Sequence, residues 1–429
     1  MNPRLIQLTV AMCLAAAAKW ALGAPLADRE LELVVLADLN GNASAELATL
    51  VSEPQGAGGV GQFGVVPTVY VKDSATGARI SSFRLFELDH WHTLELIAVP
   101  LSDGSLIGAL QQHSGGAIRI TLYDAATGAF VRNIAFLDTS RTAIAATFVP
   151  DATGPGVPGL AVLAWVGPID GRGYSYTAGE EVIIEVRRPD TGERLQKLYN
   201  LYYPAWDYGY DVRPLAIAQV DDQNGNGSSE LAVLARVWGY RKTIAVVTRD
   251  TQSADYLSPY NLGNGEATMI YTNIGKPVGF VPLPDASGDG QAELAVLGSV
   301  GNVYRLQLRE ITDGALVWSR RTIVDWTPRQ IRALGDVDGN GAAEIAVAAL
   351  RPNGRITVDV RDGATQALTS RTNFLPVGFD PRGLEVLPDQ SGNGVEELAV
   401  LGRNPQSGEV RIQIRDAATG ELLRTLLRP

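Results

Sequence analysis

Hydrophobic and polar residues alternate in short runs along most of the chain, and clusters of Asp, Asn, Gly and Thr separate these runs. The run RITVDV, from Arg355 to Val360, places apolar side chains at every second position, which is typical of a β-strand. No stretch shows a sustained helical period. The pattern predicts an all-β protein in which many short strands are joined by tight turns.

An Asp-rich loop recurs directly before an apolar run. The clearest copy, DVDGNGAAE, runs from Asp336 to Glu344 and leads into IAVAAL. Four further copies begin at Asp38, Asp222, Asp285 and Asp389, a worn copy begins at Asp151, and an eroded one lies near Asp103. The starting points lie 48 to 71 residues apart, which indicates an array of seven similar units.

A second turn motif, D-x-x-T-G or a variant of it, lies between successive Asp-rich loops. Copies begin at Asp73, Asp124, Pro189, Thr312, Asp362 and Asp416. Asp and Thr can bond their own backbone and Gly adopts positive φ, so this motif predicts a β-hairpin. Each unit therefore consists of a strand, the Asp-rich loop, a strand, a short link, a strand, the hairpin and a last strand.

Seven units of four antiparallel strands predict a seven-bladed β-propeller over residues 27–429. A single unit cannot bury both faces of its small sheet, whereas a closed ring of units can. An open β-solenoid or a row of small sandwiches is the alternative architecture.

The Asp-rich loops carry the donor atoms of a cation site. In five copies, oxygen-bearing side chains stand at positions 1, 3, 5 and 9, counted from the first Asp. Hard oxygen atoms on a flexible loop suit Ca²⁺, whereas Zn²⁺ prefers His or Cys and Mg²⁺ demands a stricter octahedron. The residues predicted to bind calcium are Asp38, Asn40, Asn42 and Glu46; Asp222, Asn224, Asn226 and Glu230; Asp285, Ser287, Asp289 and Glu293; Asp336, Asp338, Asn340 and Glu344; and Asp389, Ser391, Asn393 and Glu397.

Two copies of the loop are predicted to be empty. The copy at Asp151 has Pro155 at position 5 and Gly159 at position 9, neither of which offers an oxygen-bearing side chain. The copy near Asp103 is shortened.

The first residues predict export. Residues 1–23 combine an early Arg4, an apolar stretch and small residues before Gly23, which is the layout of a secretory signal peptide. Cys13, the single cysteine, lies in this segment, so the mature chain is expected to contain no disulfide. Its stability must then come from packing or from cations held by oxygen. A secreted, periplasmic or cell-surface location follows.

The net charge of −11 argues against binding partners that are themselves negatively charged. An acidic chain without a basic cluster argues against nucleic acid and against anionic membrane surfaces. No integral membrane segment is expected in the mature chain.

The repeated D-x-[DNS]-x-[DN]-G-x-x-E loop, followed by ELAVL or EIAVA, resembles the FG-GAP repeats of integrin α-chain propellers and the VCBS repeats of bacterial secreted proteins. The resemblance covers the mature chain and implies a seven-bladed propeller with calcium between the first two strands of a blade. It also implies binding or adhesion rather than catalysis. The chain departs from the integrin pattern because no FG and GAP sequences frame the loops.

These observations favour a non-catalytic binding, adhesion or scaffold module with a protein partner. No catalytic residue and no organic cofactor are predicted, since nucleophile-elbow, zinc-protease and phosphate-loop motifs are absent from the sequence. The first alternative is a lectin-like propeller that binds glycans through the aromatic insertion YNLYYPAWDYGYDV, whose candidate ligand surface is Trp206, Asp207, Tyr208 and Tyr210. The second is a polysaccharide-active lyase or hydrolase.

Overall fold

The computed structural model describes residues 31–54, 65–85, 91–102, 104–137, 141–166, 181–202, 211–238, 243–255, 276–300, 303–312, 314–322 and 325–427. Every regular element in these residues is a β-strand, and none of them forms a helix that could cross a membrane. The predicted signal peptide (residues 1–23), Asp103 of the eroded loop, and Trp206, Asp207, Tyr208 and Tyr210 lie outside them.

The strands form seven antiparallel sheets, which we number as blades in chain order. Blade 1 contains β1 (Leu31–Leu36), β2 (Glu46–Pro54), β3 (Val65–Asp73) and β4 (Arg79–Arg84). Blade 2 contains β5 (Trp91–Leu101), β6 (Gly104–His113), β7 (Ile118–Asp124) and β8 (Phe130–Phe136). Blade 3 contains β9 (Thr142–Val149), β10 (Gly159–Val166), β11 (Glu181–Arg187) and β12 (Arg194–Tyr202).

Blade 4 has three described strands, β13 (Asp211–Val220), β14 (Glu230–Trp238) and β15 (Thr243–Asp250). Blade 5 contains β16 (Lys276–Leu283), β17 (Glu293–Val300), β18 (Val303–Glu310) and β19 (Leu316–Thr322). Blade 6 contains β20 (Thr327–Leu334), β21 (Glu344–Leu350), β22 (Ile356–Asp362) and β23 (Leu368–Phe374). Blade 7 contains β24 (Asp380–Leu387), β25 (Glu397–Arg403), β26 (Val410–Asp416) and β27 (Leu422–Leu427).

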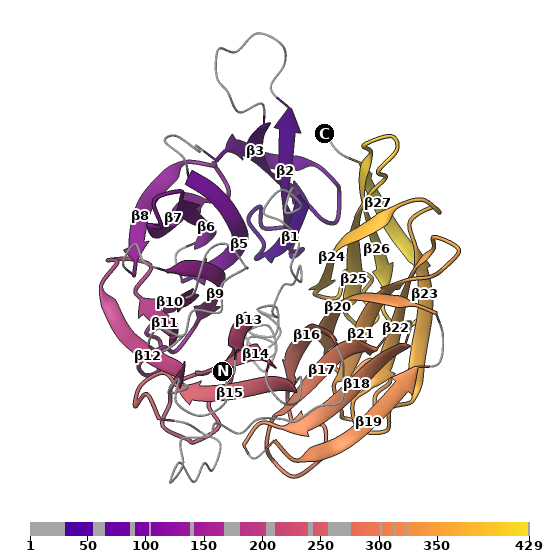
Figure 1. Ribbon diagram of the computed structural model, residues 1–429. Coiled ribbons are helices and arrows are strands. Elements are labelled where there is room, and N and C mark those ends of the chain that lie inside the picture. The colour runs from indigo at the N-terminus through magenta and orange to yellow at the C-terminus, as the bar shows by residue number, and fades with distance from the viewer. Residues whose placement is uncertain are drawn as a thin grey trace.

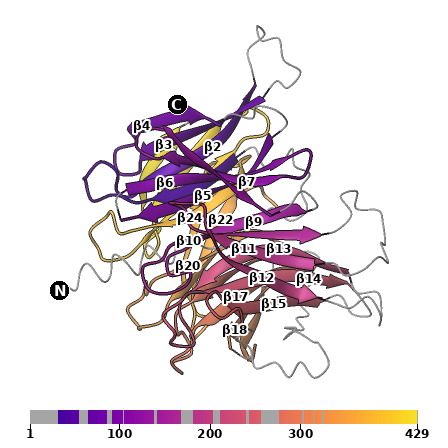
Figure 2. The ribbon, with the colours of Figure 1, turned by 90° about the vertical axis from the view of Figure 1, so that its left-hand side faces the viewer.

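The seven sheets close into a ring. The first strands of successive blades contact one another all the way round, and β1 contacts β24, so blade 1 lies beside blade 7 (Figure 1). Figure 2 shows the same ring from the side. The prediction of a seven-bladed propeller is confirmed. Each blade is built from one continuous stretch of chain, so within the described residues the ring closes without exchange of a strand between its ends.

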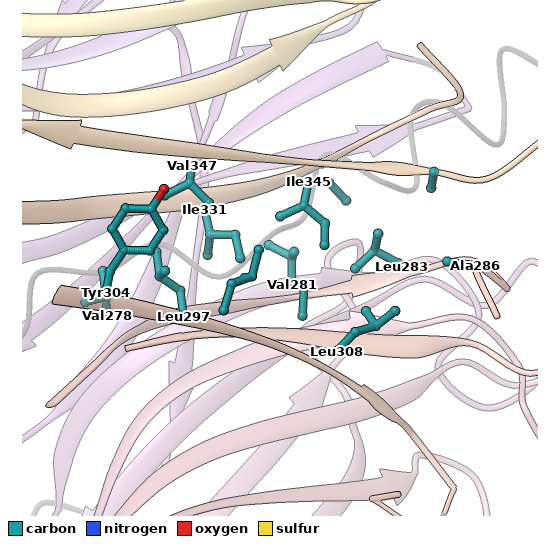
Figure 3. Close-up of a cluster of buried hydrophobic side chains, with 14 of the residues drawn as sticks. Val278, Val281, Leu283, Ala286, Leu297, Tyr304, Leu308, Ile331, Ile345 and Val347 are labelled. Carbon is teal, nitrogen blue, oxygen red and sulfur yellow. The ribbon is translucent and has the colours of Figure 1, made fainter. Parts of the chain in front are cut away.

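Seven hydrophobic clusters hold the ring together, one in each interface between neighbouring blades. Successive residues of one strand belong to different clusters: Leu47 packs towards blade 7 and Ala48 towards blade 2. Both faces of each sheet are therefore buried, which explains the continuous apolar runs of the second strands. Figure 3 shows the cluster between blades 5 and 6, where Leu297 and Tyr304 face Ile331 and Ile345.

The connections divide between the two ends of the ring. Because consecutive strands are antiparallel, the Asp-rich loop between the first and second strands lies at the same end as the hairpin between the third and fourth. We call this the loop end. The connections between second and third strands, and the links from blade to blade, start and finish at the opposite end.

Candidate metal centres

The first Asp of each intact loop organises the backbone of that loop. In blade 6, Asp336 Oδ1 accepts the N–H of Gly339 at 2.7 Å, and Oδ2 accepts the N–H of Gly341 at 2.8 Å. The corresponding Asp of blades 1, 4, 5 and 7 makes the same two bonds to positions 4 and 6. Gly339 and Gly341 have φ of 80° and 91°, so the curl of the loop relies on the left-handed region. Blade 1 keeps the curl with Ala43 at position 6, at φ 65°.

The position-9 glutamates begin the second strands of the five blades and are fully buried. In blade 6, Glu344 Oε2 accepts the N–H of Val337 at 2.7 Å. Its Oε1 is buried and finds no hydrogen-bond donor among the described residues, and the same is true of Glu46 Oε1 and Glu230 Oε1. A bare, buried carboxylate oxygen is strongly disfavoured unless a cation or a proton satisfies it.

Burial raises the pKa of these glutamates. The pKa of Glu344 rises to about 7 because burial disfavours its ionised form; the bond from Val337 opposes this rise and the nearby Asp338 and Asp336 add to it. Burial likewise raises the pKa of Glu46 and Glu397 to about 7 and that of Glu230 to about 8, and it raises the pKa of Glu293. A divalent cation at this point would oppose the shift, because it favours the ionised carboxylate.

The loops of blades 5 and 6 bring three acids within reach of one ion. Oxygen atoms of Asp285, Asp289 and Glu293 lie within 4.8 Å of one another, and so do those of Asp336, Asp338 and Glu344. In each set the two aspartates are exposed and the glutamate is buried, so the site is open to solvent on the side of the aspartates. Together with the amide and hydroxyl side chains of these loops, this oxygen-only donor set fits Ca²⁺.

The hairpin aspartates are part of these centres and were not among the residues predicted from the sequence. Asp73 Oδ2 accepts the side-chain amides of Asn40, at 2.6 Å, and of Asn42. Asp250, Asp362 and Asp416 accept the amides of the loop asparagines in blades 4, 6 and 7. Burial alone would raise the pKa of Asp73, but the bonds from Thr76, Asn40 and Asn42 together hold it below its ordinary value.

The pairing of the second and third strands of a blade identifies these aspartates as part of the site. The position-9 glutamate pairs across the sheet with the first residue of the hairpin, as Glu46 does with Asp73 and Glu344 with Asp362. Two motifs about 30 residues apart in the sequence therefore meet at one site. In blade 5 the paired hairpin residue is Glu310, which is also an acid.

In blades 6 and 7 the hairpin connects the centre to the preceding blade. In blade 6, Gly363 N donates to Ala343 O of the same blade's loop at 3.0 Å. Gly363 O accepts the indole N–H of Trp318, on the last strand of blade 5, at 2.6 Å. Ser81 and Ser370 bond the hairpins of blades 2 and 7 in the same way. A cation that stiffens the loop therefore also supports a contact between blades.

The worn loop of blade 3 differs from the intact ones. Asp151 still accepts the N–H of Gly156, at 2.5 Å. At position 9, a Cβ on Gly159 would lie 2.7 Å from Ala152 Cβ and 2.8 Å from Val186, so no carboxylate can replace this glycine without rearrangement. In place of the hairpin aspartate it has Arg188, directly before Pro189, and Arg188 pairs with Asp190 rather than with the loop. That this loop binds no ion stays a prediction.

No protein-family model matches the chain, and no curated protein sequence is significantly similar to it. Its resemblance to FG-GAP and VCBS repeats therefore stays a prediction. Solved structures with a similar fold include Saccharomyces cerevisiae Sqt1, with 11% identity over 91% of this chain and 84% of that chain and a TM-score of 0.49. Another is the Dos1 propeller, with 12% identity over 90% of this chain and 92% of that chain and a TM-score of 0.47. A third is the fucoside-bound Aleuria aurantia lectin, with 9% identity over 92% of this chain and 95% of that chain and a TM-score of 0.41. They assign neither a ligand nor a reaction to this chain.

The stability of the metal-free protein should fall as the pH rises. The raised pKa values mean that the folded state holds these protons more tightly than the unfolded state, so the free energy of unfolding decreases from about pH 4.5 to about pH 7. Urea unfolding of protein stripped of metal on a chelating resin, at intervals from pH 5 to pH 8, measures this slope. Saturating Ca²⁺ should abolish or reverse it, and an equal slope with and without Ca²⁺ would contradict the account.

Glu344→Gln should change the free energy of unfolding in opposite directions in the metal-free and the Ca²⁺-bound protein. Without metal at pH 8, the neutral amide removes a buried charge and should raise the free energy of unfolding by an amount on the order of 1 kcal/mol. With Ca²⁺, the variant loses a ligand and should be less stable than the parent protein. Urea unfolding of both proteins in both states tests this, and Glu421→Gln, on an exposed side chain, is the matched control. The same sign of change in both states would rule out a ligand role for Glu344.

Proposed function

We propose that this protein is an exported, calcium-stabilised β-propeller that acts as a non-catalytic binding or scaffold module. The observation that carries the calcium assignment is the bare Oε1 of three fully buried glutamates, each at the base of an oxygen-rich loop. The cation would be held by the residues at positions 1, 3, 5 and 9, with the hairpin aspartate as an additional negative charge. Ca²⁺ accepts such a set because it tolerates six to eight oxygen ligands in irregular geometry.

The role of the cation in this proposal is structural. Each loop lies at the start of a second strand that is buried on both faces. The hairpins of blades 6 and 7 each accept a hydrogen bond from the preceding blade. Neutralising the glutamate stabilises the strand entrance and the contact together. This suits an exported protein whose mature chain is predicted to lack cysteine, since extracellular Ca²⁺ modules typically bind at about 10⁻⁴ to 10⁻³ M.

The proposed binding role rests on how the two ends of the ring differ. The metal loops and hairpins occupy the loop end, which leaves the opposite end for a partner. Two large apolar side chains are exposed there, Val377 in the link between β23 and β24 and Leu427 at the end of β27, whereas Phe130, Leu316, Leu368 and Leu422 are exposed at the loop end, where the fourth strands leave the hairpins. A protein partner is the first choice and a glycan the alternative.

Calcium should raise the melting temperature. At a free Ca²⁺ concentration about ten times the dissociation constant, one site adds about 1.4 kcal/mol to the free energy of unfolding. Five sites add about 7 kcal/mol, which for a chain of this length corresponds to roughly 8 °C. Differential scanning calorimetry in about 2 mM Ca²⁺ and in chelator measures the shift.

Two matched substitutions test which loops contribute. Asp336→Ala should remove about one fifth of the calcium-dependent shift, because four intact loops remain. Asp151→Ala should leave the shift unchanged. A shift that Asp151→Ala reduces as much as Asp336→Ala would overturn the assignment of intact and empty loops, and melting that is indifferent to Ca²⁺ would overturn the proposed function.

A further inference from the structure

The Asp-rich loops of neighbouring blades face one another through positions 2 and 8. In three intact loops the side chain at position 2 packs towards the next blade: Leu39, Ala286 and Val337 belong to the hydrophobic clusters shared with blades 2, 6 and 7. Position 8 faces the opposite way in blade 4, where Ser229 N donates to Asp151 O of blade 3 at 2.8 Å. Position 2 is therefore directed to the next blade and position 8 to the preceding one.

In blades 4 and 7 position 2 is a glutamine, which replaces the apolar contact by hydrogen bonds. Gln223, in blade 4, makes three of them. Its N–H donates to Glu230 Oε2 at 3.0 Å, its Nε2 donates to Asp221 O at 2.8 Å, and its Oε1 accepts the N–H of Ala292 at 3.1 Å. Ala292 is position 8 of the blade 5 loop and directly precedes Glu293. The side-chain amide is thus held from both ends, and it joins two different Asp-rich loops.

Gln390 of blade 7 makes the corresponding link to blade 1. Its N–H donates to Glu397 at 2.9 Å, and its Nε2 donates to Ser74 Oγ in the blade 1 hairpin. Ser74 is fully buried, and both its hydroxyl and its N–H donate to Ala45 O, which is position 8 of the blade 1 loop. A glutamine at position 2 therefore links two separate pairs of neighbouring loops.

The bridge of Gln223 reaches a candidate calcium ligand at each end. Glu230 offers Oε1 to an ion while its Oε2 holds the N–H of Gln223, so an ion that fixes this carboxylate also fixes the backbone of position 2. The amide of Gln223 then holds the backbone next to Glu293, the position 9 residue of blade 5. A loop that is already ordered binds an ion at a lower cost in conformational entropy. An ion in one loop therefore prepares the other loop for binding.

We infer that the calcium sites of blades 4 and 5 are coupled through Gln223, so that Ca²⁺ in one loop raises the affinity of the other. The inference rests on the proposed calcium sites and adds a relation between them. The bridge of Gln390 gives blades 7 and 1 the same coupling. Because coupling between two binding sites is reciprocal, the loss of either ion weakens the other site by the same factor. One neutral hydrogen bond corresponds to a factor of about five.

Hydrogen exchange of the whole protein at increasing free Ca²⁺, followed by peptide mass spectrometry, measures the two loops separately. Residues 222–230 and 285–293 each give the Ca²⁺ concentration at which half of their protection is reached. Asp222→Ala removes the blade 4 site and should raise this midpoint about fivefold in the blade 5 loop. Asp285→Ala should raise the midpoint of the blade 4 loop by the same factor. Asp38→Ala removes the site of blade 1, which borders neither blade, and should change neither midpoint.

Gln223→Leu tests the bridge itself. Blade 1 shows that an intact loop accepts this residue, because Leu39 stands at its position 2 and its N–H still donates to Glu46, at 2.9 Å. The variant should raise both midpoints about fivefold, and adding Asp222→Ala should not raise the blade 5 midpoint further. Gln406→Leu, on an exposed residue between β25 and β26, is the matched control and should change neither midpoint.

Three results would overturn the inference. An unchanged blade 5 midpoint in Asp222→Ala would show that the two sites are independent. A further rise of this midpoint in the combined variant would show that the coupling does not pass through Gln223. Either result would leave the proposed function standing. Loops whose exchange in the parent protein does not respond to Ca²⁺ would overturn the proposed function together with the inference.

Discussion

Burial of both faces of every sheet is the constraint on which the rest of this structure depends. Seven small sheets exclude water only by packing against each other in a closed ring, and each interface has its own hydrophobic cluster. The second strand lies inside this packing from its first residue onward. That residue is a glutamate in five blades, so the ring itself places a carboxylate where water cannot reach it. The oxygen-rich loop is the compensation, because a cation there can satisfy the buried group.

The same constraint separates the roles of the two turns. The Asp-rich loop curls around the carboxylate of its first residue, and the hairpin supplies a second acid that orients the loop amides. The hairpin also accepts a bond from the preceding blade. Cation, loop, hairpin and neighbouring blade thus form one connected unit at the loop end.

Most of the fold could be predicted from the sequence, because the period of the two turn motifs already gives seven units of four strands. The glutamate at position 9 could be predicted for the same reason. The hairpin aspartates could not be recognised as part of the site, because Asp73 meets Asn40, 33 residues away in the sequence, only through the register in which β2 pairs with β3.

The most direct test of the central claim is a crystal structure of the protein grown in Ca²⁺, with anomalous diffraction data to locate the ions. We expect ions in the loops of blades 1, 4, 5, 6 and 7, with Glu344 Oε1 about 2.3 to 2.6 Å from the ion of blade 6, and no ion at Asp151. Loops without ions, in which the Oε1 atoms of Glu46, Glu230 and Glu344 remain without any partner, would contradict the account.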